Sequence, residues 1–185
     1  IILLMILAVL DTRLQQYIEF TDEVIVQEGL SSVTQILEND LKKIGFSVPE
    51  QETTVLAADS VTFTFLGDID FDGVADTVSY AAGASSELVS TPNPTDRFLY
   101  RTINGSPSGG AKVGQITDFE FAYLNQDGSL IDTSVPANLA AVKLVRVTLR
   151  VENPAIYGDD STPSRYQYQS AFWQQTRLVS RNLRR

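Results

Sequence analysis

The first ten residues, IILLMILAVL, contain no polar side chain. As a helix they span about 15 Å, roughly half of the hydrocarbon core of a bilayer. A helix that is apolar on every face needs cover all around it, which a small domain rarely offers. Three interpretations of this segment compete: the apolar core of a signal peptide, a buried helix of the domain, and the distal part of a longer membrane helix. The third is favoured because Asp11-Thr-Arg-Leu14 follows, in place of a small-residue cleavage site.

The composition of the whole chain excludes most familiar catalytic centres. Its 185 residues fit one domain, and its 43% hydrophobic and 20% charged residues are typical of a globular protein. The chain has no Cys and no His, so it lacks disulfides, thiolate and imidazole metal ligands, and Ser-His-Asp triads. A net charge of −9 argues against nucleic acid as a partner. We therefore expect the chain not to be an enzyme.

A second helical segment is predicted after the apolar start. Ser32 begins a capping-box pattern, and apolar side chains then recur at helical spacing as far as Ile44. Gly45 is suited to end a helix, so the pattern predicts an amphipathic helix over residues 32–45. Between the two helical segments, residues 20–29 combine threonine, consecutive β-branched residues and glycine, all weak helix formers. We expect this stretch to be less regularly helical than its neighbours.

Beyond Pro49 the hydrophobic pattern changes from helical to alternating. Turn dipeptides such as Asp-Gly and Asn-Gly separate the alternating segments. The predicted strands are residues 60–66, 74–81, 97–103, 116–124, 140–152 and 166–180. The predicted fold class is α+β, with a long N-terminal helix, apolar and then amphipathic, packed on a mostly antiparallel β-sheet head. We divide the chain into a spine of residues 1–30 and a globular head of residues 31–185.

An aspartate-rich loop, Gly67-Asp-Ile-Asp-Phe-Asp-Gly-Val-Ala-Asp76, joins two of the predicted strands. Hard cations such as calcium take about six to eight oxygen ligands, and short carboxylates at alternate positions of a tight loop supply them. The predicted calcium ligands are Asp68, Asp70, Asp72 and Asp76, with the backbone carbonyl of Val74. The loop differs from an EF-hand because strands flank it and the closing glutamate is absent. An acidic hairpin turn without a metal is the alternative.

The order of these features resembles type IV pilins and the pseudopilins of type II secretion systems. The similarity is greatest to W-class minor pilins and J-class pseudopilins, in which an apolar helical start leads to a helix ending like LENDLKKIGF, at residues 37–46. Residues 119–128 and 139–153, the closing Arg181-Asn-Leu183 and the aspartate-rich loop also resemble this group. The family has a processed Phe at its start and Glu at position five, where this chain has Met5. The resemblance therefore implies further residues before Ile1.

The resemblance implies a structural subunit of a type IV pilus-like or pseudopilus filament, and a minor, priming or tip role stays open. Such subunits wait in the bacterial inner membrane and then join copies of themselves or other pilins in a periplasmic or extracellular filament. The N-terminal helix makes these contacts. The implied assembly residues are Ile1, Ile2, Leu3, Leu4, Met5, Ile6, Leu7, Val9, Leu10, Leu14, Tyr17 and Ile18. The alternative is a membrane-anchored, calcium-binding, β-rich adhesin domain that does not polymerise.

Overall fold

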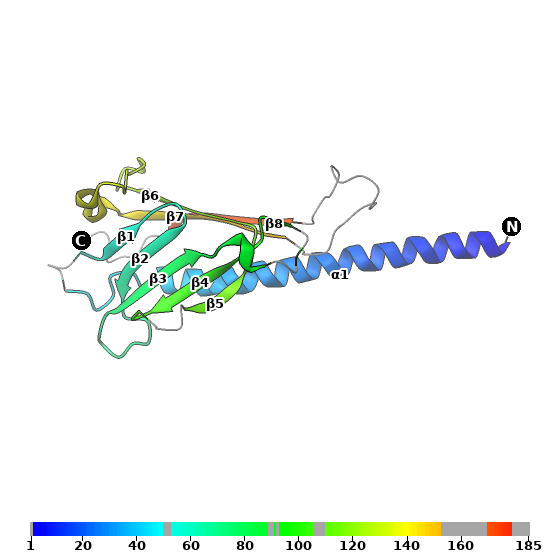
Figure 1. Cartoon of the computed structure of the whole chain (residues 1–185), viewed down its shortest axis with the longest axis horizontal. Helices are drawn as coiled ribbons and strands as arrows, with labels where there is room; N and C mark the ends of the chain where they lie inside the picture. The colour runs from blue at the N-terminus through cyan, green and yellow to red at the C-terminus, as the bar shows by residue number, and fades with distance from the viewer. Residues whose placement is uncertain are drawn as a thin grey trace.

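The computed structural model describes residues 2–49, 53–88, 91, 93–105, 110–152 and 170–178. One long helix, α1 (Ile2–Leu41), extends from a β-rich head, and its C-terminal part lies along the head (Figure 1). Two short 3-10 helices, η1 (Ser85–Glu87) and η2 (Pro136–Ala141), lie between strands of the head. The N-terminal turns of α1 therefore have no part of the described head beside them.

The strands of the head form two antiparallel sheets. The larger sheet has the order β1 (Val55–Ala58), β2 (Thr62–Gly67), β3 (Asp76–Ala82), β4 (Arg97–Ile103) and β5 (Ala111–Ile116). The smaller sheet has the order β6 (Asp118–Leu124), β7 (Leu144–Glu152) and β8 (Ser170–Leu178). Every neighbouring pair of strands runs antiparallel, so consecutive strands connect by turns or loops.

The core lies between the sheets and the C-terminal part of α1. Along β2 and β7, buried and less buried residues alternate, as the period of a half-buried strand requires. Phe63 of β2 pairs with Tyr80 of β3, and Phe65 pairs with Val78, and all of these side chains are fully buried. From α1 the core takes residues spaced by three or four positions, which share one helix face. These are Val26, Leu30, Val33, Leu37 and Leu41.

The prediction of a weak segment at residues 20–29 is wrong. α1 runs without interruption from Ile2 to Leu41, so Ser32 lies inside the helix and does not begin one. Val26 is only 2% exposed, and a Cβ at Gly29 would lie 3.5 Å from the Cγ1 atom of a residue in β7. Packing on the head thus outweighs the cost of weak helix formers, which for a glycine is about 1 kcal/mol.

The predicted C-terminal end of the helix needs a smaller correction. α1 ends at Leu41, and turns follow as far as Ser47. Gly45 has a positive φ of 73°, as expected of a glycine near a helix end. Its N–H donates to the carbonyl of Leu66 in β2, over 2.8 Å, and not to a carbonyl of the helix. The sheet therefore satisfies this N–H and holds the end of α1.

The predicted α+β fold class is wrong. The protein is mostly a β-sheet protein, because its described strands contain more residues than α1 and form two sheets in place of one. A long apolar helix is also absent from the described residues, since charged side chains begin at Asp11 and follow through the rest of α1. Within that part of the chain, no helix combines the length and the apolarity needed to cross a membrane. The division between residues 30 and 31 stays a prediction, although α1 passes through it unbroken.

Candidate functional site

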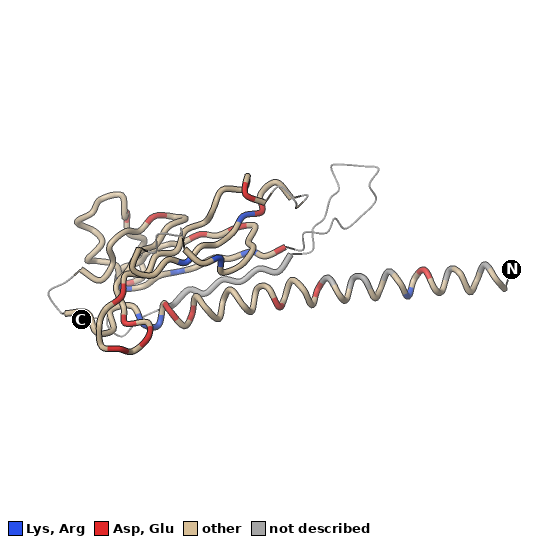
Figure 2. Tube along the Cα trace, turned by 60° about the horizontal axis from the view of Figure 1, so that its bottom comes forward, with Lys and Arg blue, Asp and Glu red and all other residues tan. Residues whose placement is uncertain are grey.

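The aspartate-rich loop between β2 and β3 lies beside the last turns of α1. Acidic residues gather there, next to basic residues at the end of the helix (Figure 2). The N–H of Asp68 donates to the carbonyl of Phe46 over 3.1 Å, and the rings of Phe46 and Phe71 are 5.7 Å apart, edge to face. Phe71 and Gly73 have positive φ angles of 65° and 91°, so the backbone turns back sharply within the loop. The loop is therefore attached to the turn that follows α1.

Asp68 is the buried member of the loop, with a residue exposure of 1%. Its Oδ2 atom accepts hydrogen bonds from the hydroxyl of Ser47, at 3.0 Å, and from the N–H of Gly73, at 2.9 Å. Its Oδ1 atom is buried and has no hydrogen-bond partner among the described residues. Burial raises the pKa of Asp68, but the hydrogen bonds from Ser47 and from backbone N–H groups outweigh it and hold the pKa below the ordinary 3.8. Asp68 is therefore ionised at neutral pH.

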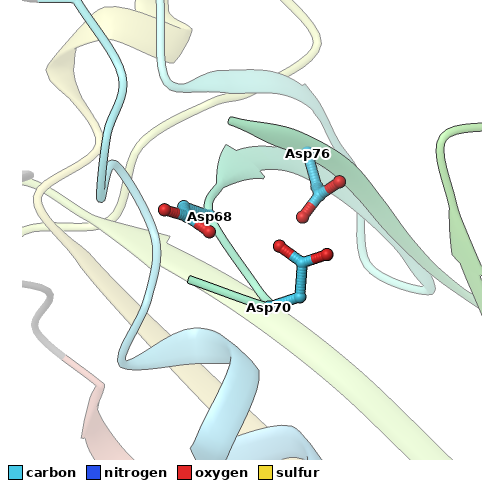
Figure 3. Close-up of side chains that lie close together, drawn as sticks. All are labelled: Asp68, Asp70 and Asp76. Carbon is cyan, nitrogen blue, oxygen red and sulfur yellow. The ribbon is translucent and has the colours of Figure 1, made fainter. Parts of the chain in front are cut away.

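Three carboxylates of the loop converge. Asp68, Asp70 and Asp76 each offer one oxygen within 4.8 Å of the others, and Figure 3 shows their side chains facing a common space. Hydrogen bonds to both carboxylate oxygens fix the orientation of Asp76. Its Oδ2 accepts a hydrogen bond from the N–H of Ile69 over 3.1 Å, and its Oδ1 accepts one from Asn104 Nδ2 over 2.7 Å. The arrangement offers a hard cation several oxygen ligands from one short segment.

Asp72, another predicted ligand, is not part of this group of three carboxylates. The side chain of Asp72 is exposed, and its Oδ1 atom accepts a hydrogen bond from the N–H of Val74 over 2.8 Å. Asp72 therefore stabilises the turn, as the hairpin alternative expects of an aspartate in this position. The carbonyl of Val74 stays a predicted ligand, and the side chain of this residue is 65% exposed.

Asn104 is a residue of the site that the sequence reasoning missed. It lies directly after β4, with a φ of 51°, and its Oδ1 atom accepts the N–H of Thr77 over 2.9 Å while its Nδ2 atom holds Asp76. The dipeptide Asn104-Gly105 indicated a turn, but nothing in its local pattern indicated that this turn meets the aspartate-rich loop. Only the pairing of β3 with β4 brings the two together.

Lys43 supplies positive charge next to the loop. Its Nζ atom donates to the carbonyl of Ile69 over 2.6 Å and lies 4.5 Å from the centroid of the Phe71 ring. Residues 51–96 contain eight acidic residues and no Lys or Arg, so this positive charge comes from the turn that follows α1 and not from the neighbouring strands. One lysine leaves most of the loop's negative charge uncompensated.

The predicted assembly residues form a second candidate surface, on the N-terminal part of α1. Nine of them have described side chains, each between 51% and 76% exposed: Ile2, Leu3, Met5, Ile6, Leu7, Val9, Leu10, Leu14 and Tyr17. Ile1 and the side chains of Leu4 and Ile18 lie outside the described residues. Large apolar side chains gathered at this density on a soluble surface mark a site of contact with lipid or protein.

Neither the comparison with models of known protein families nor the comparison with curated proteins finds a match for this chain. The resemblance to pilins and pseudopilins rests on the residues quoted above and stays a prediction. The two surfaces therefore have to be interpreted from their own chemistry.

Proposed function

We propose that the chain is a structural subunit of a filament of the type IV pilin or pseudopilin kind, and that it assembles through the N-terminal part of α1. The observation that supports this most is the exposure of nine large apolar side chains on helical turns that the described head does not cover. Burying one such side chain completely is worth about 1.5–3 kcal/mol. Contact with the same helix of neighbouring copies would cover these side chains on all sides, because no face of residues 2–10 is polar.

The proposal includes the surroundings of the subunit. Before assembly, the apolar turns lie in the bacterial inner membrane, and after assembly they lie inside a periplasmic or extracellular filament. Partners are copies of the chain or other pilins, whose helices present the same kind of surface. Nucleic acid is not a partner, since the net charge is −9. The alternative, an anchored adhesin domain that does not polymerise, keeps the same side chains in lipid.

Removing residues 1–24 tests this proposal. Among the described side chains of α1, the buried ones begin at Val26, so the truncation takes away exposed apolar surface and leaves the helix face that packs on the head. The expected product is a soluble monomer whose circular dichroism spectrum keeps the β-sheet signal of the head. Precipitation or unfolding of the truncated chain would show that these turns belong to the core of the domain.

Cross-linking distinguishes a filament subunit from an anchored domain. The chain has no Cys, so a single introduced cysteine reports on one position. Leu7→Cys, at a helix position 53% exposed, should form disulfide-linked dimers in the assembled state. Glu120→Cys, at an exposed position of β6, is the matched control. Equal yields of dimer from the two variants would favour the anchored domain.

A further inference from the structure

We propose that Asp68, Asp70 and Asp76 bind a calcium-class divalent cation, and that the bound cation holds the β2–β3 loop to the turn that follows α1. The inference is independent of filament assembly. It begins from Asp68 Oδ1, which is buried and has no hydrogen-bond partner among the described residues. Leaving a buried acceptor unsatisfied destabilises a fold, more so when the group is charged. A cation between the three carboxylates satisfies this oxygen and compensates its charge.

The spacing of the three carboxylates fits calcium. Calcium binds oxygen at about 2.3–2.6 Å, so two ligand oxygens on opposite sides of the ion are about 4.6–5.2 Å apart. The three ligand atoms lie within 4.8 Å of one another, so any two of them are close enough to contact the same calcium ion. Magnesium binds oxygen at about 2.0–2.1 Å, so opposite ligands are only about 4.0–4.2 Å apart, and it keeps its waters more tightly.

Neighbouring groups orient the carboxylates as they orient ligands in known metal sites. Ser47 and Gly73 both donate to Oδ2 of Asp68, which leaves Oδ1 as the oxygen available to a cation. Asn104 holds Asp76 from the neighbouring turn at the end of β4. Lys43 donates to the backbone carbonyl of Ile69 and does not form a salt bridge with a carboxylate of the loop among the described residues. The negative charge of the cluster therefore remains for a metal.

The position of the site connects the cation to α1. Asp68 is attached to the turn after α1 by its side chain, through Ser47, and by its N–H, through Phe46. Asp76 begins β3 on the other side of the loop, and Asp70 lies between Asp68 and Asp76 in the sequence. A cation bound to all three joins these two sides, so its binding should stabilise the attachment of the loop to the end of the helix.

Calorimetric titration and thermal melts of the full chain, in a mild detergent and freed of metal with EDTA, test the proposal. Calcium chloride at a concentration well above its dissociation constant should raise Tm by about 5–10 °C, since it binds the folded state. Magnesium chloride should raise Tm by less than half as much. No binding heat and no change of Tm at millimolar calcium would overturn the proposal, and equal responses to the two metals would overturn the selectivity.

Two single substitutions in the loop locate the site. Asp70→Asn removes a charged ligand at an exposed position and should abolish the calcium response, while Tm in EDTA stays the same or rises. Asp72→Asn removes the same charge from another exposed position of the loop, outside the cluster, and should keep the calcium response. A full response from both variants, or loss in both, would refute the three-carboxylate site. These outcomes do not depend on whether the chain forms filaments.

Discussion

Replacing Arg101 with Met should weaken the attachment of α1 to the larger sheet. Arg101 lies on β4 and donates from Nε to Oδ2 of Asp40 over 2.5 Å and from Nη2 to Oδ1 over 3.0 Å. Asp40 lies near the C-terminal end of α1 and is only 1% exposed. The hydroxyl of Tyr80 on β3 donates to the same carboxylate over 2.6 Å. This buried cluster joins the helix to two neighbouring strands.

The size of the effect follows from the burial of Asp40. Methionine keeps most of the apolar stem of Arg101 and removes its charge, so Asp40 is left as a buried carboxylate with Tyr80 as its remaining described donor. Removing one partner of a buried ion pair costs about 3–5 kcal/mol. For a domain of this size, about 2–4 °C of Tm corresponds to 1 kcal/mol, so Tm should fall by about 6–20 °C.

An exposed ion pair on the same helix provides the control. Lys42 Nζ lies 3.1 Å from Glu38 Oε2, and the two side chains are 64% and 33% exposed. Such a pair, four residues apart on a helix surface, contributes only about 0.3–0.5 kcal/mol, so Lys42→Met should change Tm by no more than about 2 °C. Circular dichroism melts of both variants and the unmodified chain, in the same detergent and at the same calcium concentration, give the comparison.

A double substitution tests the electrostatic reason. Adding Asp40→Asn to Arg101→Met removes the uncompensated charge and keeps an acceptor for the hydroxyl of Tyr80. The double variant should therefore have a higher Tm than Arg101→Met alone. The reasoning is refuted if Arg101→Met and Lys42→Met melt within about 2 °C of each other, or if the double variant melts below Arg101→Met.

Two further outcomes concern pH and packing. Burial, together with a nearby carboxylate, raises the pKa of Tyr80 and of Tyr123 above the ordinary 10.0. As the pH rises, both tyrosines ionise in the unfolded chain before they ionise in the folded one. Their contribution to the free energy of unfolding is therefore complete below pH 10. Above pH 10 each tyrosine loses about 1.4 kcal/mol of it per pH unit. Melts between pH 9 and 12 should show this decline, and it should be less steep in Tyr80→Phe. Gly29→Ala should raise Tm by about 2–4 °C, because its Cβ makes only an ordinary contact with β7. Gly114→Ala should lower Tm, because its Cβ would overlap Cγ2 of Val33, and equal melting of the two alanine variants would contradict both expectations.

Several elements of the head could be predicted because their pattern is local. The predicted strand 97–103 is confirmed as β4, and alternation of apolar residues correctly indicated strands near β2 and β7. β1 and β5 were missed because neither strand has a continuous buried stripe. In β5, Gly114 lies directly against α1, where a side chain would overlap Val33, so this contact with the helix leaves no apolar residue in the sequence pattern.

The sequence by itself determined two features that need no folding partner: an apolar decapeptide that requires outside cover, and four closely spaced aspartates in one loop. Tertiary structure alone decided that α1 continues through its weak segment, because the energy that holds residues 26–30 in a helix comes from the head they pack on. It also decided which aspartates converge. Asp68 turns inward because Ser47 lies beside it, and Asp76 is held because pairing of β3 with β4 brings Asn104 to it. Both contacts join residues more than 20 positions apart in the sequence, and a local sequence pattern cannot predict contacts over such a separation.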